Sequence, residues 1–292
     1  MRIDLHTHST ASDGTHTPDD VVRLAAAAGL DALALTDHDS MAGWAEAATA
    51  AARYGLAVVP GMEISTTYAG AGVHLLGYLL DPTYEPLAAE LAMILHGREG
   101  RLPAVIDRLR RAGMDITERD VRLQVGPAPA IGRPHIADVM VAKGIVADRA
   151  EAFATWLSAG RPGHVERYAT KTTTMIELVT AAGGAAVIAH PWGRGSRRVV
   201  DLEALAVFTD AGLVGLEVDH QDHSSSDRRA LRAMAGELGL VVTGSSDFHG
   251  DGKVDHDLGC NLTAVGDYET LLDAAASNAA TAGLDVPRVA RP

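Results

Sequence analysis

Seven short apolar runs, separated by longer segments, limit the folds open to this chain more than any other feature. Two of the intervening segments, 18–29 and 44–55, have helical patterns that end at a glycine, and the first begins at Pro18. Strands that alternate with helices predict βα units around a largely parallel sheet or barrel, so we expect an α/β fold. The apolar runs cover residues 2–6, 31–37, 56–64, 73–80, 185–191, 214–218 and 240–249.

The stretch DLHTHSTASDG places His6, His8 and Asp13 directly behind the first apolar run. Residues two apart on a strand point to the same side, so His6 and His8 would present two imidazoles together, and Asp13 would arrive from the following loop. Such an arrangement can hold a metal ion. Three polar residues near a surface terminus are the alternative for this stretch taken by itself.

Further side chains that can bind metals lie in or just after the other predicted strands. Most of them fall at the carboxyl end of a strand, where the loops of a βα barrel form the active site. Buried charged groups almost always have partners or metals, so this pattern favours a metal centre over a chance set of core polar residues. These side chains are Asp37, His38, Glu63, His74, His190, Asp247 and His249.

The interval from His74 to His190 is far longer than a βα connection, which is typically ~2–6 residues. Its middle has the pattern of several helices. We therefore expect two domains: a barrel formed by residues 1–97 and 166–292, and a small helical insertion, residues 98–165, that caps the barrel mouth.

Within the predicted insertion, Pro134 stands at the first turn of a helix and Arg133 just before it. Helix N-termini attract anions, and a guanidinium can hold a phosphate in a bidentate manner. Arg133 is therefore a candidate ligand of a substrate phosphate, and a solvated surface charge is the alternative. For His135, helix packing and a phosphate contact are both open.

The other histidines carry weaker signals. His223 follows the sixth predicted strand and could act as a general acid toward a leaving group, although an exposed loop histidine is commoner. His220 has no clear assignment. The histidines expected at the surface are His16, His96, His164 and His256.

Composition narrows the classes of function and partner. A formal net charge of −13 argues against a broad grip on nucleic acid backbones, and so against long duplex partners, although bound cations would reverse the charge locally. The single cysteine, Cys260, excludes an intramolecular disulfide, and we expect it to be packed in the core. No apolar run approaches the ~20 residues of a membrane helix, and no secretory signal is visible. We expect a soluble, cytoplasmic protein without a membrane partner.

The motifs DLHTHS, SDG, TDHD, GMEIS, HLLGY, AHP and SDFHG, in this order, resemble those of the PHP (polymerase and histidinol phosphatase) superfamily. The resemblance covers nearly the whole chain. It points to the bacterial branch that contains nucleoside 3′,5′-bisphosphate phosphatases and 5′→3′ exoribonucleases acting on short RNA. It implies the PHP fold, a distorted (βα)7 TIM-like barrel, with up to three metal ions at its mouth.

Carried over motif by motif, the resemblance implies three ion sites. One would use His6, His8, Glu63 and Asp247, and a second would use Asp13, His38 and His249. Glu63 would bridge to a third ion, completed by His74 and His190. A ligand set of imidazoles and carboxylates without thiolate suits Mn²⁺, Zn²⁺ or Fe²⁺ better than Mg²⁺ or Ca²⁺.

We therefore expect a phosphoric ester hydrolase in which metal-activated hydroxide attacks a nucleoside 3′,5′-bisphosphate or the 5′ end of short RNA. A histidinol-phosphate-type or general small-molecule phosphatase is the main alternative. An amidohydrolase is less favoured, because many of those enzymes bridge their metals with a modified lysine, whereas Glu63 takes that place here. A catalytically silent PHP module is also less favoured, because such a module would have lost metal ligands, whereas this chain retains nine. The candidate catalytic residues are Asp247, His249, Arg133 and His223, and the candidate substrate-binding residues are Arg133, His135 and His223.

Overall fold

The structure is a computed structural model that describes residues 1–193 and 195–291. All seven predicted strands are present, and the two-residue β5 is an addition that the apolar pattern does not signal. The strands are β1 (Ile3–Thr7), β2 (Ala32–Leu35), β3 (Ala57–Tyr68), β4 (Ala71–Tyr78), β5 (Thr170–Lys171), β6 (Ala185–Ala189), β7 (Leu213–Asp219) and β8 (Val241–Gly244).

The helices follow the predicted alternation with the strands. Thr17 caps the first helix through its side chain, with Pro18 in the first turn, and Gly55 ends the second in a left-handed conformation. The α-helices are α1 (Pro18–Ala27), α2 (Trp44–Tyr54), α3 (Glu85–Arg111), α4 (Glu118–Val125), α5 (Arg133–Ala142), α6 (Arg149–Ala152), α7 (Thr172–Ala181), α8 (Leu202–Asp210), α9 (Ser225–Leu238) and α10 (Val265–Ala282). Shorter turns are the π-helix η1 (Phe153–Leu157) and the 3₁₀ helices η2 (Ser196–Arg198) and η3 (Gly250–Gly252).

The strands form one curled sheet in the order β1-β2-β3-β4-β6-β7-β8, with β5 paired to β3. Most neighbours are parallel, but β4 runs antiparallel to both β3 and β6. A short parallel bridge between Thr7 and Phe248 brings the two ends of the sheet together, and the amide of His8 donates to the carbonyl of Phe248 at 2.8 Å. The predicted distorted barrel of the α/β class is confirmed.

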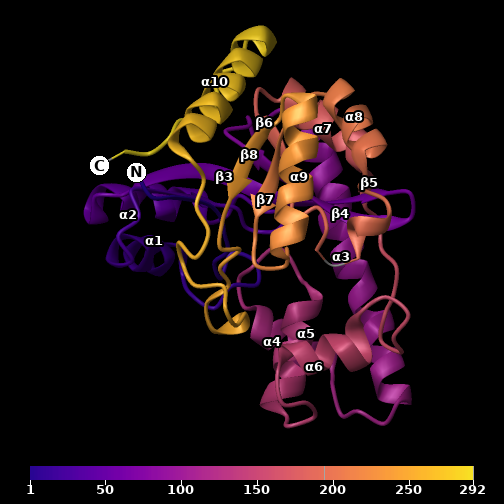
Figure 1. The fold of residues 1–292 in the computed structure, drawn as a ribbon. Coiled ribbons are helices and arrows are strands. Elements are labelled where there is room, and N and C mark those ends of the chain that lie inside the picture. Colours follow the sequence, from indigo (N-terminus) through magenta and orange to yellow (C-terminus); the bar gives the residue numbers. More distant parts are fainter. Residues whose placement is uncertain (194, 292) are drawn as a thin grey trace.

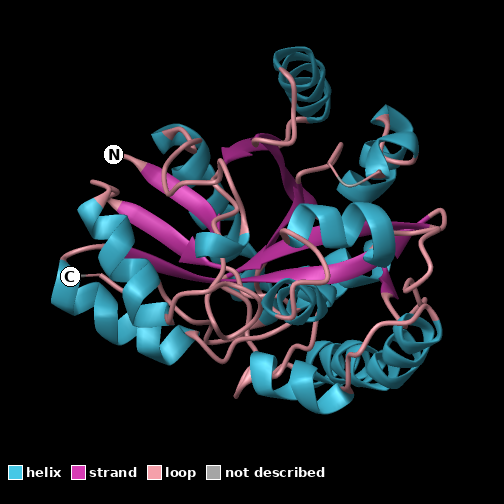
Figure 2. Ribbon diagram, turned by 90° about the horizontal axis from the view of Figure 1, so that it is seen from below, coloured by secondary structure: helices cyan, strands magenta, loops and turns pink. Residues whose placement is uncertain are grey.

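Helices lie on the outside of the curled sheet (Figure 2). Buried side chains such as Leu5, Val59 and Val187 fill one side of it, and Met62, Ile188 and Leu216 pack on the other. Because the parallel strands end near one another, the residues at their carboxyl ends share one end of the barrel.

The helix α3 crosses the position where the sequence places the start of the insertion. It runs unbroken through residue 97, and its first half packs on the barrel core through Leu87, Leu91 and Ile94. Its second half belongs to a separate apolar cluster that extends from Leu102 to Leu157. We call residues 98–165 the cap, and Figure 1 shows α4, α5 and α6 gathered at one end of the molecule.

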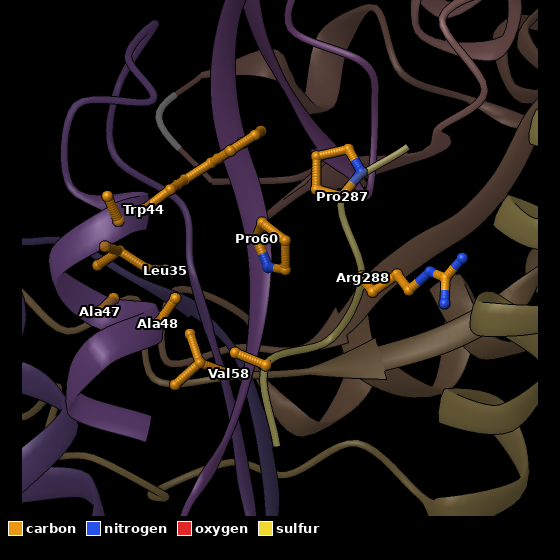
Figure 3. Close-up of a pocket in the computed structure, with 10 residues that line it drawn as sticks. Leu35, Trp44, Ala47, Ala48, Val58, Pro60, Pro287 and Arg288 are labelled. Atoms are coloured by element: carbon orange, nitrogen blue, oxygen red, sulfur yellow. The ribbon is translucent and has the colours of Figure 1, made fainter. Parts of the chain in front are cut away.

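An apolar pocket of about 220 Å³ lies between α2, β3 and the C-terminal segment (Figure 3). Trp44, Pro60 and Pro287 line it, and its described lining contains no histidine, cysteine or carboxylate. It therefore lacks the groups that the sequence predicts for the functional site. Among the described helices, none combines the length and apolar character needed to cross a membrane.

Candidate metal centre

The first donor group consists of His6, His8, Glu63 and Asp247, all fully buried. His6 lies on β1 and His8 directly follows it, and their Nε2 atoms are 3.0 Å apart. The Oε2 atom of Glu63, from β3, lies 3.4 Å and 3.2 Å from these two nitrogens. Asp247 Oδ1, from the loop after β8, lies 3.5 Å and 3.3 Å from them.

These separations match what a bound ion requires. A tetrahedral ion with bonds of ~2.1 Å holds its donor atoms roughly 3.4 Å apart. Four donors from three distant parts of the chain thus converge at the spacing of a coordination shell.

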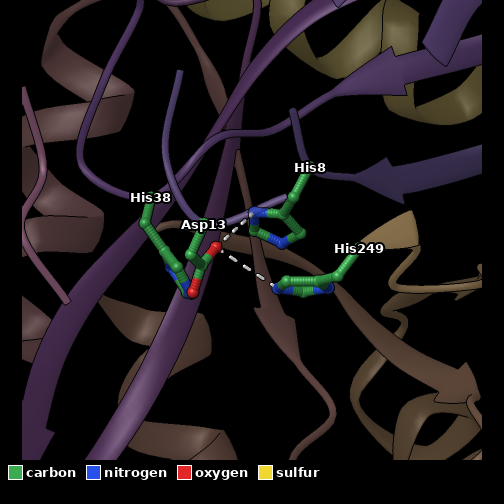
Figure 4. A group of neighbouring side chains, drawn as sticks. All are labelled: His8, Asp13, His38 and His249. Atoms are coloured by element: carbon green, nitrogen blue, oxygen red, sulfur yellow. Dashed lines mark ion pairs between the residues drawn. The ribbon is translucent and has the colours of Figure 1, made fainter. Parts of the chain in front are cut away.

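The second donor group combines Asp13, His38 and His249 with the other ring nitrogen of His8 (Figure 4). Asp13 Oδ1 lies 3.4 Å from His249 Nε2 and 3.8 Å from His8 Nδ1. Asp13 Oδ2 lies 3.6 Å from His38 Nε2. The sequence did not assign His8 to this group.

Glu63 connects the first group to a third. Its Oε1 atom lies 2.6 Å from His74 Nδ1 and 3.0 Å from His190 Nε2, while Oε2 lies 2.9 Å from His38 Nδ1. The two oxygens of one carboxylate therefore face different sets of imidazoles. This is the geometry of a bridging ligand.

Two atoms of this centre test whether the residues fit a metal. Glu63 Oε2 and His38 Nδ1 are buried and lie 2.9 Å apart, yet neither forms a hydrogen bond of acceptable geometry with any described residue. A buried polar atom without a partner is costly, and an ion between these donors would remove that cost. The donor types and spacings fit divalent cations.

The pKa shifts in the centre show that its buried carboxylates are stabilised by neighbouring positive charge. Burial alone would raise the pKa of Glu63, but the charges of His38, His74 and His6 hold it well below its ordinary value. Burial also lowers the pKa of His8, yet bonds to Asp247 and Glu63 raise it to about 9. The carboxylates therefore stay ionised and draw protons onto neighbouring imidazoles, which a metal would replace.

Glu217 forms hydrogen bonds to two of the proposed ligand residues, and the sequence analysis did not identify it. It lies on β7, and its Oε1 accepts from His6 Nδ1 at 3.0 Å and from the hydroxyl of Ser245. Its Oε2 accepts from the backbone amide of His190 at 2.7 Å. The only sequence signal for it is an acidic residue inside the apolar run 214–218.

Two proposed ligands have strained backbone conformations. His190 has φ of 26° and Asp247 has φ of 52°. A non-glycine residue in such a conformation costs about 1–3 kcal/mol, and such strain is concentrated at functional sites. At His190, the bond from its amide to Glu217 holds the turn in place.

The outer oxygen of Asp247 has its own partners. Oδ2 accepts from Lys253 Nζ and lies 3.3 Å from His220 Nε2, so Oδ1 is left facing the first donor group. His256 completes a further cluster with His220 and Asp247, and it is buried, bonding to the carbonyl of Ser246. Our expectation of a surface position for His256 is wrong, because its loop turns inward and its ring bonds to the carbonyl of Ser246.

In the structure, the three candidate substrate-binding residues form hydrogen bonds with backbone groups of the protein. Arg133 Nη1 donates to the carbonyl of Leu157 at 3.0 Å, and its guanidinium lies over the ring of Phe153. His135 is buried, accepts from the amide of Gly132 and donates to the carbonyl of Ser12 at 2.8 Å. Both of its nitrogens are thus occupied by backbone groups.

His223 is also buried rather than in an exposed loop. Its Nδ1 faces the carbonyl of Val218 at 2.9 Å, and its Nε2 accepts from the amide of Trp192 at 3.3 Å. A ring held between a backbone acceptor and a backbone donor is a neutral tautomer with no proton directed at a leaving group. The general-acid role of His223 therefore stays a prediction, which would require the ring to give up one of these backbone bonds.

The predicted positions of the other histidines and of Cys260 have mixed outcomes. His96 is exposed, whereas His16 and His164 are half-buried. Cys260 is exposed, not packed in the core, because it lies in the surface loop between β8 and α10.

Comparisons with known proteins agree with this geometry. The sequence pattern of the PHP domain matches residues 4–116. The chain is 37% identical to a 3′,5′-nucleoside bisphosphate phosphatase from Chromobacterium violaceum, over 88% of this chain and 90% of the relative. It is 35% identical to a 5′-3′ exoribonuclease from Haemophilus influenzae, over 85% and 90% of the two chains.

A solved structure shows the same likeness in three dimensions. It is that of a proposed metal-dependent phosphoesterase from Bifidobacterium adolescentis, with a TM-score of 0.88 and 37% identity over 93% of this chain and 96% of that one. The similarity extends over both the barrel and the cap. The chain therefore belongs to the PHP family of metal-dependent phosphoesterases.

Proposed function

We propose that this enzyme removes a phosphate from nucleoside 3′,5′-bisphosphates and acts on the 5′ end of short RNA. The observation that carries the proposal is the cluster of three overlapping donor groups around Glu63, at the barrel end that the cap approaches. Relatives that match this chain over 90% of their own length include a 3′,5′-nucleoside bisphosphate phosphatase and a 5′-3′ exoribonuclease.

We assign the donor groups to as many as three divalent ions, with Mn²⁺, Zn²⁺ and Fe²⁺ as candidates. His6, His8, Glu63 and Asp247 would hold one, and Asp13, His38 and His249 a second. Glu63, His74 and His190 would hold a third. Bound ions would supply Lewis-acid stabilisation of the phosphate oxygens and lower the pKa of an attacking water.

The chain's own residues set up this chemistry in three ways. Glu63 presents one oxygen to each side of the cluster, so it fixes the spacing of the groups around it. Glu217 orients His6 by accepting from its Nδ1, which leaves Nε2 facing the other donors. Lys253 and His220 occupy the outer oxygen of Asp247 and orient its inner one.

A phosphate-release assay with the Mn²⁺-loaded enzyme tests this proposal. The panel contains adenosine 3′,5′-bisphosphate, a 5′-phosphorylated dinucleotide, AMP and histidinol phosphate. We expect kcat/KM for the first two to exceed that for AMP by about ten-fold or more, the effect of one added charge-assisted contact. Histidinol phosphate should be poorer still.

Two results would contradict the proposal. Equal efficiency on AMP and the bisphosphate would remove the requirement for two phosphates. A preference for histidinol phosphate would assign the protein to the alternative substrate class.

A further inference from the structure

Asp37 is a buried carboxylate that the proposed function does not use. It lies two residues after β2, directly before the proposed ligand His38, and only 1% of its surface is exposed. The strand-end pattern in the sequence singles it out as able to bind a metal, yet among the described residues it belongs to none of the three donor groups. A buried carboxylate must have partners, so Asp37 needs another explanation.

The carboxylate of Asp37 accepts three hydrogen bonds from the segment that joins His8 to Asp13. Its Oδ1 accepts from the amide of Ser9 at 2.8 Å and from Ser12 Oγ at 2.6 Å. Its Oδ2 accepts from Ser9 Oγ at 2.7 Å. These donors are uncharged, and they come from the first and the last residue of the turn. One side chain therefore holds both ends of the turn from Ser9 to Ser12.

The turn is tight, and it folds Asp13 back toward His8. The amides of Ser12 and Gly14 both donate to the carbonyl of Ser9 at 3.0 Å. A Cβ atom on Gly14 would lie only 2.6 Å from the carbonyl oxygen of His8, so the two arms of the turn approach as closely as a glycine allows. Because the backbone is this compact, the bonds to Asp37 position the segment as a unit beside β2.

Ser12 links Asp37 to the second donor group. Ser12 Oγ lies 2.6 Å from Asp37 Oδ1 and 3.4 Å from Asp13 Oδ1. A hydroxyl carries one proton, and the shorter distance directs that proton to Asp37. Asp13 Oδ1 is then not drawn toward Ser12, and it faces His8 and His249 (Figure 4).

We propose that Asp37 is a positioning residue of the second metal site. It holds the turn so that Asp13 meets His38 and His249, and its buried negative charge favours a cation in that group without binding the cation itself. This inference rests on the proposed function, which assigns a divalent ion to Asp13, His38 and His249. Asp37 thereby fixes two of these ligands, one through the turn and the other as its neighbour in the chain.

The variant Asp37→Asn tests this assignment, because it keeps the shape of the side chain and removes its charge. We expect the affinity of the second donor group for Mn²⁺ to fall by about 10–100-fold, the scale on which partners of metal ligands act. At limiting Mn²⁺ the variant should retain about one ion fewer per chain than wild type. Titration calorimetry of the metal-free protein and metal analysis measure these effects. Asp201→Asn, at an exposed helix start where the carboxylate accepts from the amide of Ala204, is the matched control and should bind metal as wild type does.

Ser12→Ala provides a second test if Asp37→Asn does not fold. It removes one of the three bonds and keeps the charge of Asp37, so the affinity of the second group should fall by a smaller factor, about three- to ten-fold. Kinetics give a further readout. With adenosine 3′,5′-bisphosphate, excess Mn²⁺ should restore kcat in both variants and leave KM unchanged, because neither side chain would contact the substrate.

A purely structural role for Asp37 gives a different result. All donor groups would then lose affinity together, and excess Mn²⁺ would not restore kcat. That outcome would refute the positioning role, and so would wild-type metal affinity in both variants.

Metal binding separates this inference from the proposed function, because it is measured without a nucleotide. If wild type hydrolyses no nucleotide but Asp37→Asn loses the second ion selectively, the substrate proposal fails and the positioning role stands. If wild type hydrolyses the bisphosphate and both variants bind metal as wild type does, only the positioning role fails.

Discussion

Glu63 shows how one residue sets the chemistry of the centre. It is fully buried, and its two oxygens face imidazoles from β1, β4 and the loops after β2 and β6. Such a carboxylate is tolerated only where cations surround it. The burial of Glu63 therefore implies that folding and metal binding are coupled.

Glu217 leads to a prediction at this scale. Glu217→Gln keeps the shape of the side chain but removes the charge that orients His6, so the first donor group should lose metal affinity by about 10–100-fold. Competition with a chelator, monitored by metal analysis, measures this loss. Glu237→Gln, at an exposed position of α9, is the control. Wild-type affinity in Glu217→Gln would show that His6 does not need this partner.

Most of the nine ligand candidates lie in or just after a predicted strand, and the resemblance to the PHP superfamily completed the set with Asp13 from the loop after the first strand. Glu217 was missed for a physical reason. The role of an acidic residue in an apolar run depends on what the fold places beside it, and the sequence does not show this. Arg133 was favoured by Pro134 at a helix start, a local signal that says nothing about the carbonyl that binds it.

At the scale of elements, the apolar runs located seven strands, because apolar periodicity reports burial directly. The pattern could not show that β4 reverses direction, since periodicity carries no information about the direction of pairing. It also missed the continuity of α3, because Gly97, Gly100 and Pro103 resemble a break. Packing on two separate apolar clusters overrides these weak helix formers.

The cap contacts the metal-binding loops through Arg149. Its guanidinium pairs with Asp138 of α5 at 2.5 Å and donates to the carbonyls of Asp13 and Gly252 at 3.3 Å and 3.4 Å. His135 adds a bond to the carbonyl of Ser12. The position of Asp13 thus depends on helices of the cap.

We therefore expect Arg149→Met to weaken metal binding at the second donor group by about ten-fold, the lower scale for losing an outer partner of a metal site. The free energy of unfolding should fall by about 1–3 kcal/mol, because Asp138 is left without its partner in a largely buried position. Metal titration and denaturant unfolding measure the two effects. Arg122→Met removes an exposed ion pair of the cap and should cost less than about 1 kcal/mol. Equal effects of the two variants would contradict a specific link from Arg149 to Asp13.

At the scale of the whole molecule, the protein combines a net charge of −13 with arginines and metal-binding groups gathered at one end of the barrel. Cations at the donor groups would add to the attraction of a phosphate substrate to that end. Without metal, protons take their place, so the stability of the metal-free protein must depend on pH.

The sign of this dependence follows from His6 and His8. Burial opposes their protonation, but Asp247, Glu217 and Glu63 hold the pKa of His6 well above its ordinary value, and bonds to Asp247 and Glu63 raise the pKa of His8 to about 9. Between pH 6.5 and 8 the unfolded chain loses these two protons while the folded protein keeps them. Stability therefore falls as pH rises, by about 2 kcal/mol for each proton over this window.

Other groups offset part of this effect. Burial lowers the pKa of His249 to about 4 and also lowers the pKa values of His135, His223 and His256, so the unfolded chain loses the rest of these protons in the same window and stability gains a smaller amount from each. Burial raises the pKa of Asp4 to about 6, so Asp4 is mostly deprotonated in either state above pH 6.5. Arg101, whose pKa burial lowers to about 8, acts in the opposite direction from the upper end of the window onward.

We expect the melting temperature of the metal-free protein to fall by about 2–4 °C between pH 6.5 and 8, because the net loss is about 1 kcal/mol once the opposing histidines are included and each kcal/mol shifts Tm by roughly 2–4 °C in a chain of this size. With saturating Mn²⁺ the fall should disappear, because the ions replace the protons and bind more tightly as pH rises. Scanning calorimetry with and without chelator measures both curves. His8→Gln should flatten the metal-free curve, whereas His96→Gln, at an exposed position, should not. A metal-free Tm that stays constant or rises across this window would show that these imidazoles are neutral, and the carboxylates would then need another source of positive charge.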